Sequence, residues 1–364
     1  FFKRVVLIGV GLIGGSMGLA LKRGQFAGRI VGVSRSETIE TALDMGVIDE
    51  GCSYDELAQA LEGADLVFIC TPIERILAQI EEVAALVPDG ALVTDVGSTK
   101  RRIVERARSC FREGTYFVGG HPMAGSEKAG VTAADPFLFQ NAIYVLVPDE
   151  CVPRPRYDAL VDLLRGVGAR VLELDAEAHD EAVASISHLP QLMATTLVEM
   201  VGKLNEKNDH FLPLAAGGFR DMTRIASSPF QPVWQDIYGT NADQIRAIVD
   251  RYIAILQDAR DRLEDGSLSS DFAYANRVRG SIPRDAKGFI HALYEILVVA
   301  EDRPGVIAEI ATELQQQDVN ISDIEVMKVR EGEGGTLRLG FDSEESASRA
   351  LDLLAGIGYV ARRP

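Results

Sequence analysis

The chain has 364 residues, and its 47% hydrophobic and 25% charged residues are typical of a globular protein with two or three domains. Its formal net charge of −17 argues against a nucleic-acid partner and against an anionic membrane surface, because both require a basic patch. The charge does not exclude an anionic small molecule, since such a site needs only a local group of positive side chains.

The cysteines are scattered along the chain and form no Cys-x-x-Cys pair. We therefore expect reduced thiols in a cytoplasmic protein, with neither a disulfide framework nor a metal site. The sequence contains no signal peptide and no apolar run of about 18 residues, so we expect neither secretion nor a membrane span.

A glycine-rich turn near the start of the chain predicts a dinucleotide-binding (Rossmann) domain. An apolar run at residues 4–8 predicts a buried strand, and the sequence GVGLIGGS follows at residues 9–16, before a helical pattern. Gly9 permits the tight turn, Gly11 lets the backbone approach a pyrophosphate, and Gly14 lets helix and strand pack closely. The helix N-terminus then faces the phosphates. The expected cofactor contacts here are Gly9, Gly11, Leu12, Ile13 and Gly14.

The end of the next predicted strand, residues 29–33, indicates which nicotinamide cofactor is bound. NAD sites commonly place Asp or Glu there, where the carboxylate binds the ribose 2′-hydroxyl. This chain instead has Ser34 and Arg35, and its next acidic residue is Glu37. A hydroxyl and a guanidinium suit a 2′-phosphate, so the sequence favours NADP. NAD stays open, because some NAD enzymes also lack the acid.

Strand and helix patterns continue to alternate. A strand at residues 64–70 ends at Thr71 and Pro72, which we expect beside the cofactor. A strand at residues 90–95 leads towards Ser98, whose hydroxyl is expected either to cap the following helix or to lie beside the nicotinamide. Further strands are predicted at residues 117–119, 142–147 and 170–174, and the first domain is predicted to span residues 1–175.

The segment at residues 119–128, GGHPMAGSEK, is a candidate reaction centre. Four of its ten residues are Gly or Pro, which predicts a loop, and it follows a short strand-like run at residues 116–118. Open α/β sheets bind ligands at the carboxyl ends of their strands. His121 with a hydroxyl and a charged pair therefore indicates a reaction centre; the alternative is a structural turn with one buried histidine.

After residue 175 the apolar pattern becomes helical, and an all-α domain is predicted at residues 176–285. Its first helix, residues 177–190, is expected to be interrupted by Pro190. His188 lies at this proline. Its spacing of nine from His179 does not place both rings on one helical face, so we expect no zinc pair.

Two arginines in this domain are candidates for binding an anion. Arg220 and Arg224 are four residues apart behind a glycine turn, and two guanidiniums on one face suit a dicarboxylate. The alternative is a salt bridge with Asp221 or a solvated face.

The last part of the chain predicts a small α+β domain at residues 292–364. Its strand and helix patterns follow the order βαββαβ, after a linker at residues 280–283. The turn DRPGV at residues 302–306 opens its first helix.

With these motifs in this order, the chain resembles the prephenate/arogenate (cyclohexadienyl) dehydrogenase family, and its last part resembles an ACT domain. Besides the glycine loop, the resemblance rests on residues 95–100, 120–125, 187–190, 217–224 and 302–306. It implies an α/β Rossmann domain, an all-α dimerisation domain and a C-terminal α+β ACT domain, assembled as a homodimer.

The resemblance implies a prephenate dehydrogenase of tyrosine biosynthesis, which forms 4-hydroxyphenylpyruvate by oxidative decarboxylation with hydride transfer to NAD(P). His121 would accept the proton of the ring hydroxyl, Ser98 would orient His121, and Arg224 would bind the ring carboxylate. By the same resemblance, His188 and Arg220 would contact the side chain of the substrate. The pocket would be lined or gated by Ser126, Glu127 and Lys128.

ACT domains bind amino acids, so the resemblance also implies feedback inhibition by L-tyrosine at Gly305, Asn320 and Ile321, or else an ACT domain used only for assembly. Prephenate and arogenate differ only in a keto or amino group, and an arogenate or dual-specificity enzyme stays open.

Two other functions compete with this one. A 3-hydroxyacid dehydrogenase would have Asn four residues after its catalytic Lys, whereas Lys203 is followed there by Lys207. A non-catalytic amino-acid sensor would not need His121 together with Arg224.

Overall fold

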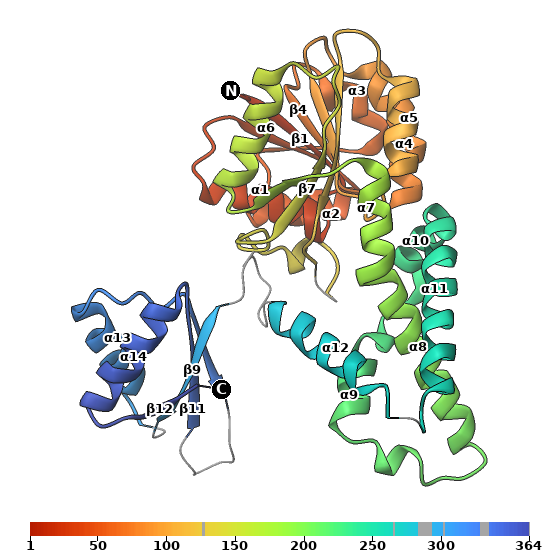
Figure 1. The fold of residues 1–364 in the computed structure, drawn as a ribbon. Coiled ribbons are helices and arrows are strands. Elements are labelled where there is room, and N and C mark those ends of the chain that lie inside the picture. Colours follow the sequence, from red (N-terminus) through yellow and green to blue (C-terminus); the bar gives the residue numbers. More distant parts are fainter. Residues whose placement is uncertain (126–127, 265, 283–292, 301–302, 328–334, 364) are drawn as a thin grey trace. The chain divides into compact units, whose positions relative to one another are not determined.

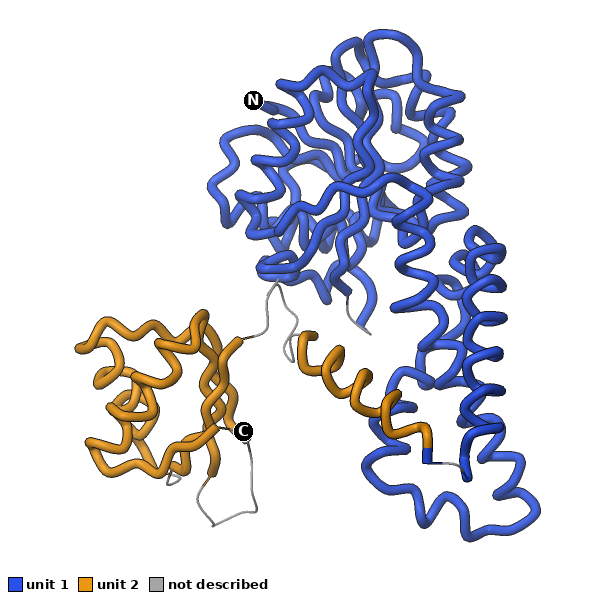
Figure 2. Tube along the Cα trace, viewed as in Figure 1, with its two compact units in different colours: residues 1–266 blue, residues 267–364 orange. Residues whose placement is uncertain are grey.

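A computed structural model describes the chain except for residues 126–127, 265, 283–292, 301–302, 328–334 and 364 (Figure 1). The chain forms two compact units, Phe1–Gly266 and Ser267–Pro364 (Figure 2). Among the described residues, no helix is long and apolar enough to cross a membrane.

The first unit is built on an eight-stranded sheet with the order β3-β2-β1-β4-β5-β6-β7-β8. Neighbouring strands are parallel except β6 and β7, which are antiparallel. From β1 the chain passes to β2 on one side and later to β4 on the other, so the topological switch lies between β1 and β4, where such sheets bind ligands. The strands are β1 (Arg4–Ile8), β2 (Arg29–Val33), β3 (Glu50–Cys52), β4 (Leu66–Ile69), β5 (Leu92–Asp95), β6 (Tyr116–Pro122), β7 (Ile143–Val147) and β8 (Arg170–Glu173).

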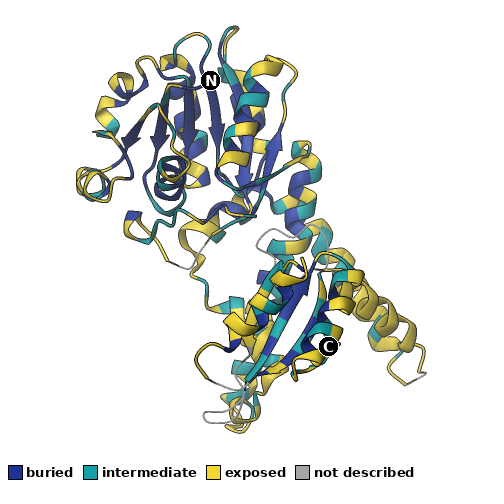
Figure 3. Cartoon of the chain, turned by 90° about the vertical axis from the view of Figure 1, so that its left-hand side faces the viewer, coloured by how far each residue is buried: buried dark blue, intermediate teal, exposed yellow. Residues whose placement is uncertain are grey.

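Helices cover both faces of this sheet, as the buried interior in Figure 3 shows. In β1, Val5 and Leu7 point into one apolar cluster with α1 and α6, while Val6 and Ile8 point into the other with α3, α4 and α5. Both faces are therefore buried, which explains the continuous apolar run of this strand. The helices are α1 (Leu12–Arg23), α2 (Ser36–Asp44), α3 (Leu57–Leu61), α4 (Ile73–Leu86), α5 (Arg101–Cys110) and α6 (Arg154–Gly166), with short η1 (Tyr54–Glu56) and η2 (Val131–Ala133).

A helical region completes the first unit, and the expected break at Pro190 is wrong. The chain remains helical from α7 through a π-helical turn into α8, with Pro190 in the first turn of α8. A proline is tolerated there because the wider turn does not require its missing N–H. The elements are α7 (Ala176–Val183), η3 (Ala184–His188), α8 (Leu189–Asn205), η4 (Leu212–Leu214), α9 (Gly217–Thr223), η5 (Arg224–Ser227), η6 (Phe230–Trp234), α10 (Gln235–Thr240) and α11 (Ala242–Asp261).

The second unit contains α12 (Ser269–Ser281) and a four-stranded antiparallel sheet in the order β10-β11-β9-β12. The predicted order βαββαβ is confirmed. Gly305 precedes α13 with φ +94°, a left-handed conformation that favours glycine. The elements are β9 (Tyr294–Ala300), α13 (Val306–Gln316), β10 (Asp323–Met327), β11 (Gly335–Phe341), α14 (Glu344–Gly356) and β12 (Val360–Arg362).

Candidate active site

His121 lies within strand β6, and the prediction of a loop at this position is wrong. Residues Gly119 to Pro122 pair with β7, and His121 is opposite Val145. The glycines that suggested a loop serve close packing instead, because a Cβ on Gly120 would lie 2.5 Å from the carbonyl oxygen of Asp95. His121 is nevertheless at the carboxyl end of its strand, as expected, and its exposed fraction is only 9%.

The ring of His121 is hydrogen-bonded to a second histidine. His121 Nδ1 lies 2.8 Å from His179 Nε2, and His179 Nδ1 lies 2.8 Å from Asp180 Oδ1. His179 and Asp180 are adjacent on α7, and both are fully buried. Burial works to raise the pKa of Asp180, but hydrogen bonds from His179 and from two backbone amides hold that pKa below its usual range. Asp180 is therefore a carboxylate near neutral pH.

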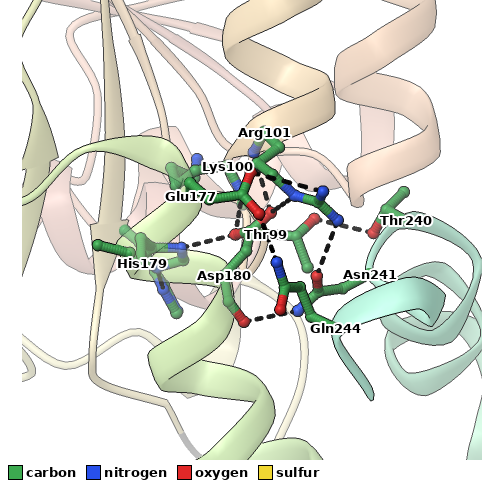
Figure 4. A network of polar contacts seen from close by, with 12 residues as sticks. Thr99, Lys100, Arg101, Glu177, His179, Asp180, Thr240, Asn241 and Gln244 are labelled. Carbon is green, nitrogen blue, oxygen red and sulfur yellow. Dashed lines mark hydrogen bonds and ion pairs between the residues drawn. The ribbon is translucent and has the colours of Figure 1, made fainter. Parts of the chain in front are cut away.

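Asp180 also caps helix α5, a role that the sequence offered to Ser98. The helix begins at Arg101, and the amides of Lys100 and Arg101 donate to Asp180 over 2.7 and 3.0 Å (Figure 4). A carboxylate is favourable at a helix N-terminus, where unpaired N–H groups and the helix dipole present positive charge. The capping role of Ser98 is therefore wrong, because its cap position is taken by Lys100 and the accepting group comes from α7.

A buried ion pair lies directly beneath this strand end. Lys100 pairs with Asp95, and both side chains are completely inaccessible to solvent. Lys100 Nζ donates to the carbonyl oxygen of Gly120 over 2.7 Å, and Asp95 Oδ1 accepts from the Gly120 amide over 3.0 Å. Burial lowers the pKa of Lys100, and the neighbouring Asp95 opposes that change. The ion pair thus holds both backbone polar groups of Gly120, the residue before His121.

His188 ends the π-helical turn and is 1% exposed. The amide nitrogen of Asn241 donates to the backbone oxygen of Asp180 over 2.9 Å and lies 3.5 Å from His188 Nδ1. An N–H donor facing Nδ1 leaves the proton of the neutral ring on Nε2. Burial lowers the pKa of His188 to about 4, a shift that His179 supports and Asp180 opposes, so the ring is neutral near pH 7. Trp234 meets this ring edge-on at 6.2 Å.

These contacts hold the nucleotide-binding region against the helical region (Figure 4). Thr99 and Thr240 share a hydrogen bond of 2.8 Å, and Arg101 forms ion pairs with Glu177 and Asp243. The site therefore lies at the seam between the sheet and the helices of the first unit.

The two arginines expected to bind carboxylates lie on exposed surface. Arg220 is in α9 and Arg224 begins η5. Their segment is tied to α8, because the side chain of buried Gln191 donates to the backbone oxygen of Ile225 over 3.1 Å. The hydrogen bonds described for His121 and His188 involve His179 and Asn241, not the arginines. Ser126 and Glu127 lie outside the described residues, and Lys128 is exposed.

The glycine loop lies at the switch point between β1 and β4. Gly9 has φ +94°, and a Cβ there would lie 2.9 Å from Thr71 Cγ2, which places the loop against the end of β4. Gly14 packs on the loop itself, since its Cβ would lie 2.1 Å from the Gly9 oxygen, whereas nothing lies within 4 Å of the corresponding position on Gly11. Gly11 precedes Leu12 and Ile13 in the first turn of α1, whose N–H groups suit an anion.

The other expected cofactor contacts lie at the ends of two strands. Thr71 is buried, with its hydroxyl donating to Gln79 over 2.9 Å, and Pro72 precedes α4. Ser34 is buried at the end of β2, while Arg35 is exposed and precedes α2.

Substitution by alanine should have different effects at Gly14 and at Gly11. Gly14→Ala should destabilise the first unit by about 1–3 kcal/mol or more, because its Cβ meets backbone that cannot retreat. Gly11→Ala should fold normally but bind the cofactor about tenfold more weakly. Urea unfolding and cofactor titration would measure both effects. Unchanged cofactor affinity in Gly11→Ala would show that this residue does not approach the pyrophosphate.

Sequence reasoning missed several buried members of the site: Asp95, Lys100, His179, Asp180 and Asn241. His179 was considered only as a zinc ligand. Among the described residues, no group of three or more His, Cys, Asp or Glu could hold a metal ion. The adjacent His179 and Asp180 near a helix start were the one local signal, because a histidine beside a carboxylate can be oriented by it.

Three family models match consecutive parts of the chain. Residues 17–173 match the nucleotide-binding domain of prephenate dehydrogenase, residues 175–277 its dimerization domain, and residues 294–351 the ACT domain. The chain is 39% identical over 355 residues to prephenate dehydrogenase of Bacillus subtilis (strain 168), an alignment that covers 95% of this chain and 94% of the relative. The chain belongs to the prephenate dehydrogenase family.

Solved structures agree with this assignment. The structure of prephenate dehydrogenase from Aquifex aeolicus, in complex with hydroxyphenyl propionate and NAD+, matches with a TM-score of 0.69 and 29% identity, over 76% of this chain and 96% of that chain. Arogenate dehydrogenase of Synechocystis matches with a TM-score of 0.67 and 29% identity, over 76% and 98%. The predicted family of NAD(P)-dependent dehydrogenases, with an ACT domain, is confirmed, and a 3-hydroxyacid dehydrogenase is set aside.

Proposed function

We propose that this chain oxidises and decarboxylates prephenate to 4-hydroxyphenylpyruvate, with hydride transfer to a nicotinamide cofactor. The observation that carries the proposal is buried His121, at the carboxyl end of a strand in the nucleotide-binding sheet, in a chain 39% identical to a prephenate dehydrogenase over nearly its full length. Its glycine loop and free helix N-terminus fit a dinucleotide pyrophosphate.

His121 is assigned the role of proton acceptor. Bound nicotinamide supplies the acceptor for the hydride that leaves the ring carbinol carbon. His121 takes the hydroxyl proton as the hydride departs, and the carbon–carbon bond to the ring carboxylate then breaks, releasing CO2. The bonding electrons make the ring aromatic, and His121 returns the proton to the phenolic oxygen. Burial lowers the pKa of His121 well below its usual value, with His179, Lys100 and His188 acting in the same direction, so the ring is neutral before reaction.

The remaining residues would bind and orient the substrate. Ser98 is assigned to orienting His121 and the nicotinamide, and Arg224 to binding the ring carboxylate through two hydrogen bonds. His188, which presents an Nε2–H donor, and Arg220 are assigned to the side-chain end of the substrate. Three residues of the segment after β6 are assigned to lining the pocket: Ser126, Glu127 and Lys128.

Assaying the purified protein with prephenate and arogenate, each with NAD and NADP, tests this function. We expect reduced nicotinamide to form with prephenate. Turnover with arogenate instead, or equally with both, would establish the alternative arogenate or dual-specificity activity. If neither substrate reduces either nucleotide, the catalytic proposal fails.

We also propose that NADP is preferred over NAD, on the basis of Ser34 and Arg35 in place of an acidic residue. Arg35→Ala should raise KM for NADP about 10- to 100-fold, because a charge-assisted contact is worth about 1.5–3 kcal/mol, and leave KM for NAD nearly unchanged. Arg165→Ala, another arginine-to-alanine change at an exposed position, in the last turn of α6, is the control. Equal effects on both nucleotides would show that Arg35 does not recognise the 2′-phosphate.

The ACT domain supports a further proposal, feedback inhibition by L-tyrosine at Gly305, Asn320 and Ile321. Asn320 is exposed after α13, so Asn320→Ala should leave uninhibited turnover unchanged and raise the half-inhibitory tyrosine concentration several-fold. Gln316→Ala, at an exposed position in the same unit, is the matched control. A wild-type enzyme insensitive to tyrosine would leave the ACT domain with a role in assembly.

A homodimer is proposed from the match to the family's dimerization domain. Exposed apolar side chains on α8 and α11 support it, including Met200, Ile255 and Leu256, and an apolar hollow of about 580 Å³ lies between these helices. Sedimentation equilibrium would measure the mass in solution.

A further inference from the structure

The reaction requires that one ring nitrogen of His121 carry a lone pair towards the substrate. A neutral imidazole has a proton on only one nitrogen, so the partner of Nδ1 decides which nitrogen is left to act as a base. That partner is His179, whose Nε2 lies 2.8 Å away and which could itself act as donor or acceptor.

The ambiguity is resolved by Asp180. Its carboxylate can only accept, and its neighbours other than His179 are donors, namely the amides of Lys100 and Arg101. The group facing it on His179, Nδ1, must therefore carry a proton. A neutral His179 then has its lone pair on Nε2 and accepts the proton on His121 Nδ1.

The charged groups around His121 and His179 are paired with one another. The cations near the two rings are Lys100 and Arg101, and the anions are Asp95, which pairs with Lys100, and Asp180, which Arg101 also approaches at 3.5 Å. His188 adds a neutral ring.

We infer that His179 and Asp180 are positioning residues that hold His121 with its proton on Nδ1 and its lone pair on Nε2, and that stabilise its positive charge after proton transfer. This inference rests on the proposed function, which makes His121 the proton acceptor. Asp180 stays ionised throughout, and its charge acts on His121 through the ring of His179. The amides at the start of α5 fix the Asp180 carboxylate. This carboxylate in turn fixes the orientation of His121 through His179.

Substitutions at Asp180 and His179 test the inference by changing which groups donate. In Asp180→Asn, an amide N–H can face His179 Nδ1 and move the proton to Nε2, which forces His121 to protonate its own Nε2 and removes the base. Turnover should fall by about 10²–10⁴-fold, as expected for a wrong tautomer, with little change in KM for the cofactor. Asp175→Asn, which makes the same change at the exposed N-cap of α7, should leave turnover within about twofold of wild type.

Two changes at His179 separate orientation from simple packing. In His179→Gln the amide oxygen can occupy the position of Nε2 and still accept from His121, so turnover should stay within about tenfold of wild type. In His179→Asn the shorter side chain satisfies Asp180 but leaves His121 Nδ1 without an acceptor, and turnover should fall about 10²-fold or more. An equal loss in both variants would overturn the inference.

A measurement on the unchanged enzyme is independent of variant folding. Nitrogen NMR of ¹⁵N-histidine-labelled protein near pH 7 should find both His121 and His179 protonated on Nδ1 and unprotonated on Nε2. A proton on Nε2 of His121 would overturn the inference, as would Asp180→Asn turnover equal to that of Asp175→Asn. The proposed function fails separately, if His121→Asn keeps wild-type turnover.

Discussion

Replacing His121 with Asn should lower turnover by about 10²–10⁴-fold and leave cofactor affinity nearly unchanged. The amide of Asn can still donate towards His179 from about the position of Nδ1, so the buried contact of 2.8 Å is replaced while the proton acceptor is lost. Steady-state kinetics and an equilibrium titration of the cofactor measure the two quantities. His210→Asn, an exposed histidine stacked on Phe211, is the control and should have no effect.

The pH dependence of kcat/KM in the wild-type enzyme is a second test of His121 as the proton acceptor. Only neutral His121 accepts a proton, and burial lowers its pKa well below 6.5. The value of kcat/KM should therefore stay level as the pH falls through 6.5 and decline only at more acidic pH, and this acidic decline should disappear in His121→Asn.

If His121→Asn lost turnover and cofactor affinity equally, the residue would be assigned to building the cofactor site and not to proton transfer.

Replacing Lys100 with Met should lower the unfolding free energy of the first unit by about 3–5 kcal/mol, the usual effect of removing one partner of a buried ion pair. Asp95 would remain as a buried charge without its cation, and the carbonyl oxygen of Gly120 would lose its donor. Trp234 is the only tryptophan of the chain and lies in this unit, so its fluorescence during urea unfolding reports the change.

Lys203→Met provides the matched control, because Lys203 forms an exposed pair with Glu199 one helical turn away. Exposed pairs of this kind contribute little to stability because water and salt screen them, so this variant should be nearly as stable as wild type. Similar losses in both variants would show that the burial of the Lys100 pair has no special importance.

Sequence reasoning succeeded where a signal is local. The glycine loop between a strand and a helix predicted the nucleotide-binding region, because the tight turn, with Gly9 at φ +94°, is encoded within a few residues. The ACT domain was found for the same reason. At His121 the residue was identified but its backbone was not, since strand pairing with β7 overrode the tendency of Gly and Pro to form loops.

The supporting part of the site was not predictable in this way. His121 and His179 are 58 residues apart, and Lys100 and Asp180 are 80 apart, so no window of sequence contains either pair. The break expected at Pro190 was wrong for a different reason. The helix continues through a π-helical turn, which does not require the N–H that proline lacks. Asn241 lies in no recognised motif, and its role comes from tertiary contacts with Asp180 and His188.

The capping of α5 by Asp180 has a consequence for how this chain can be divided. A boundary near residue 175, where the matches to the two family domains meet, leaves His121 on one side and His179 with Asp180 on the other. A fragment that ends there would keep the nucleotide loop but lack the acceptor for His121. A chimaera that exchanges nucleotide-binding regions between relatives would therefore have to include α7, because this helix, beyond the domain border, carries the acceptor for His121.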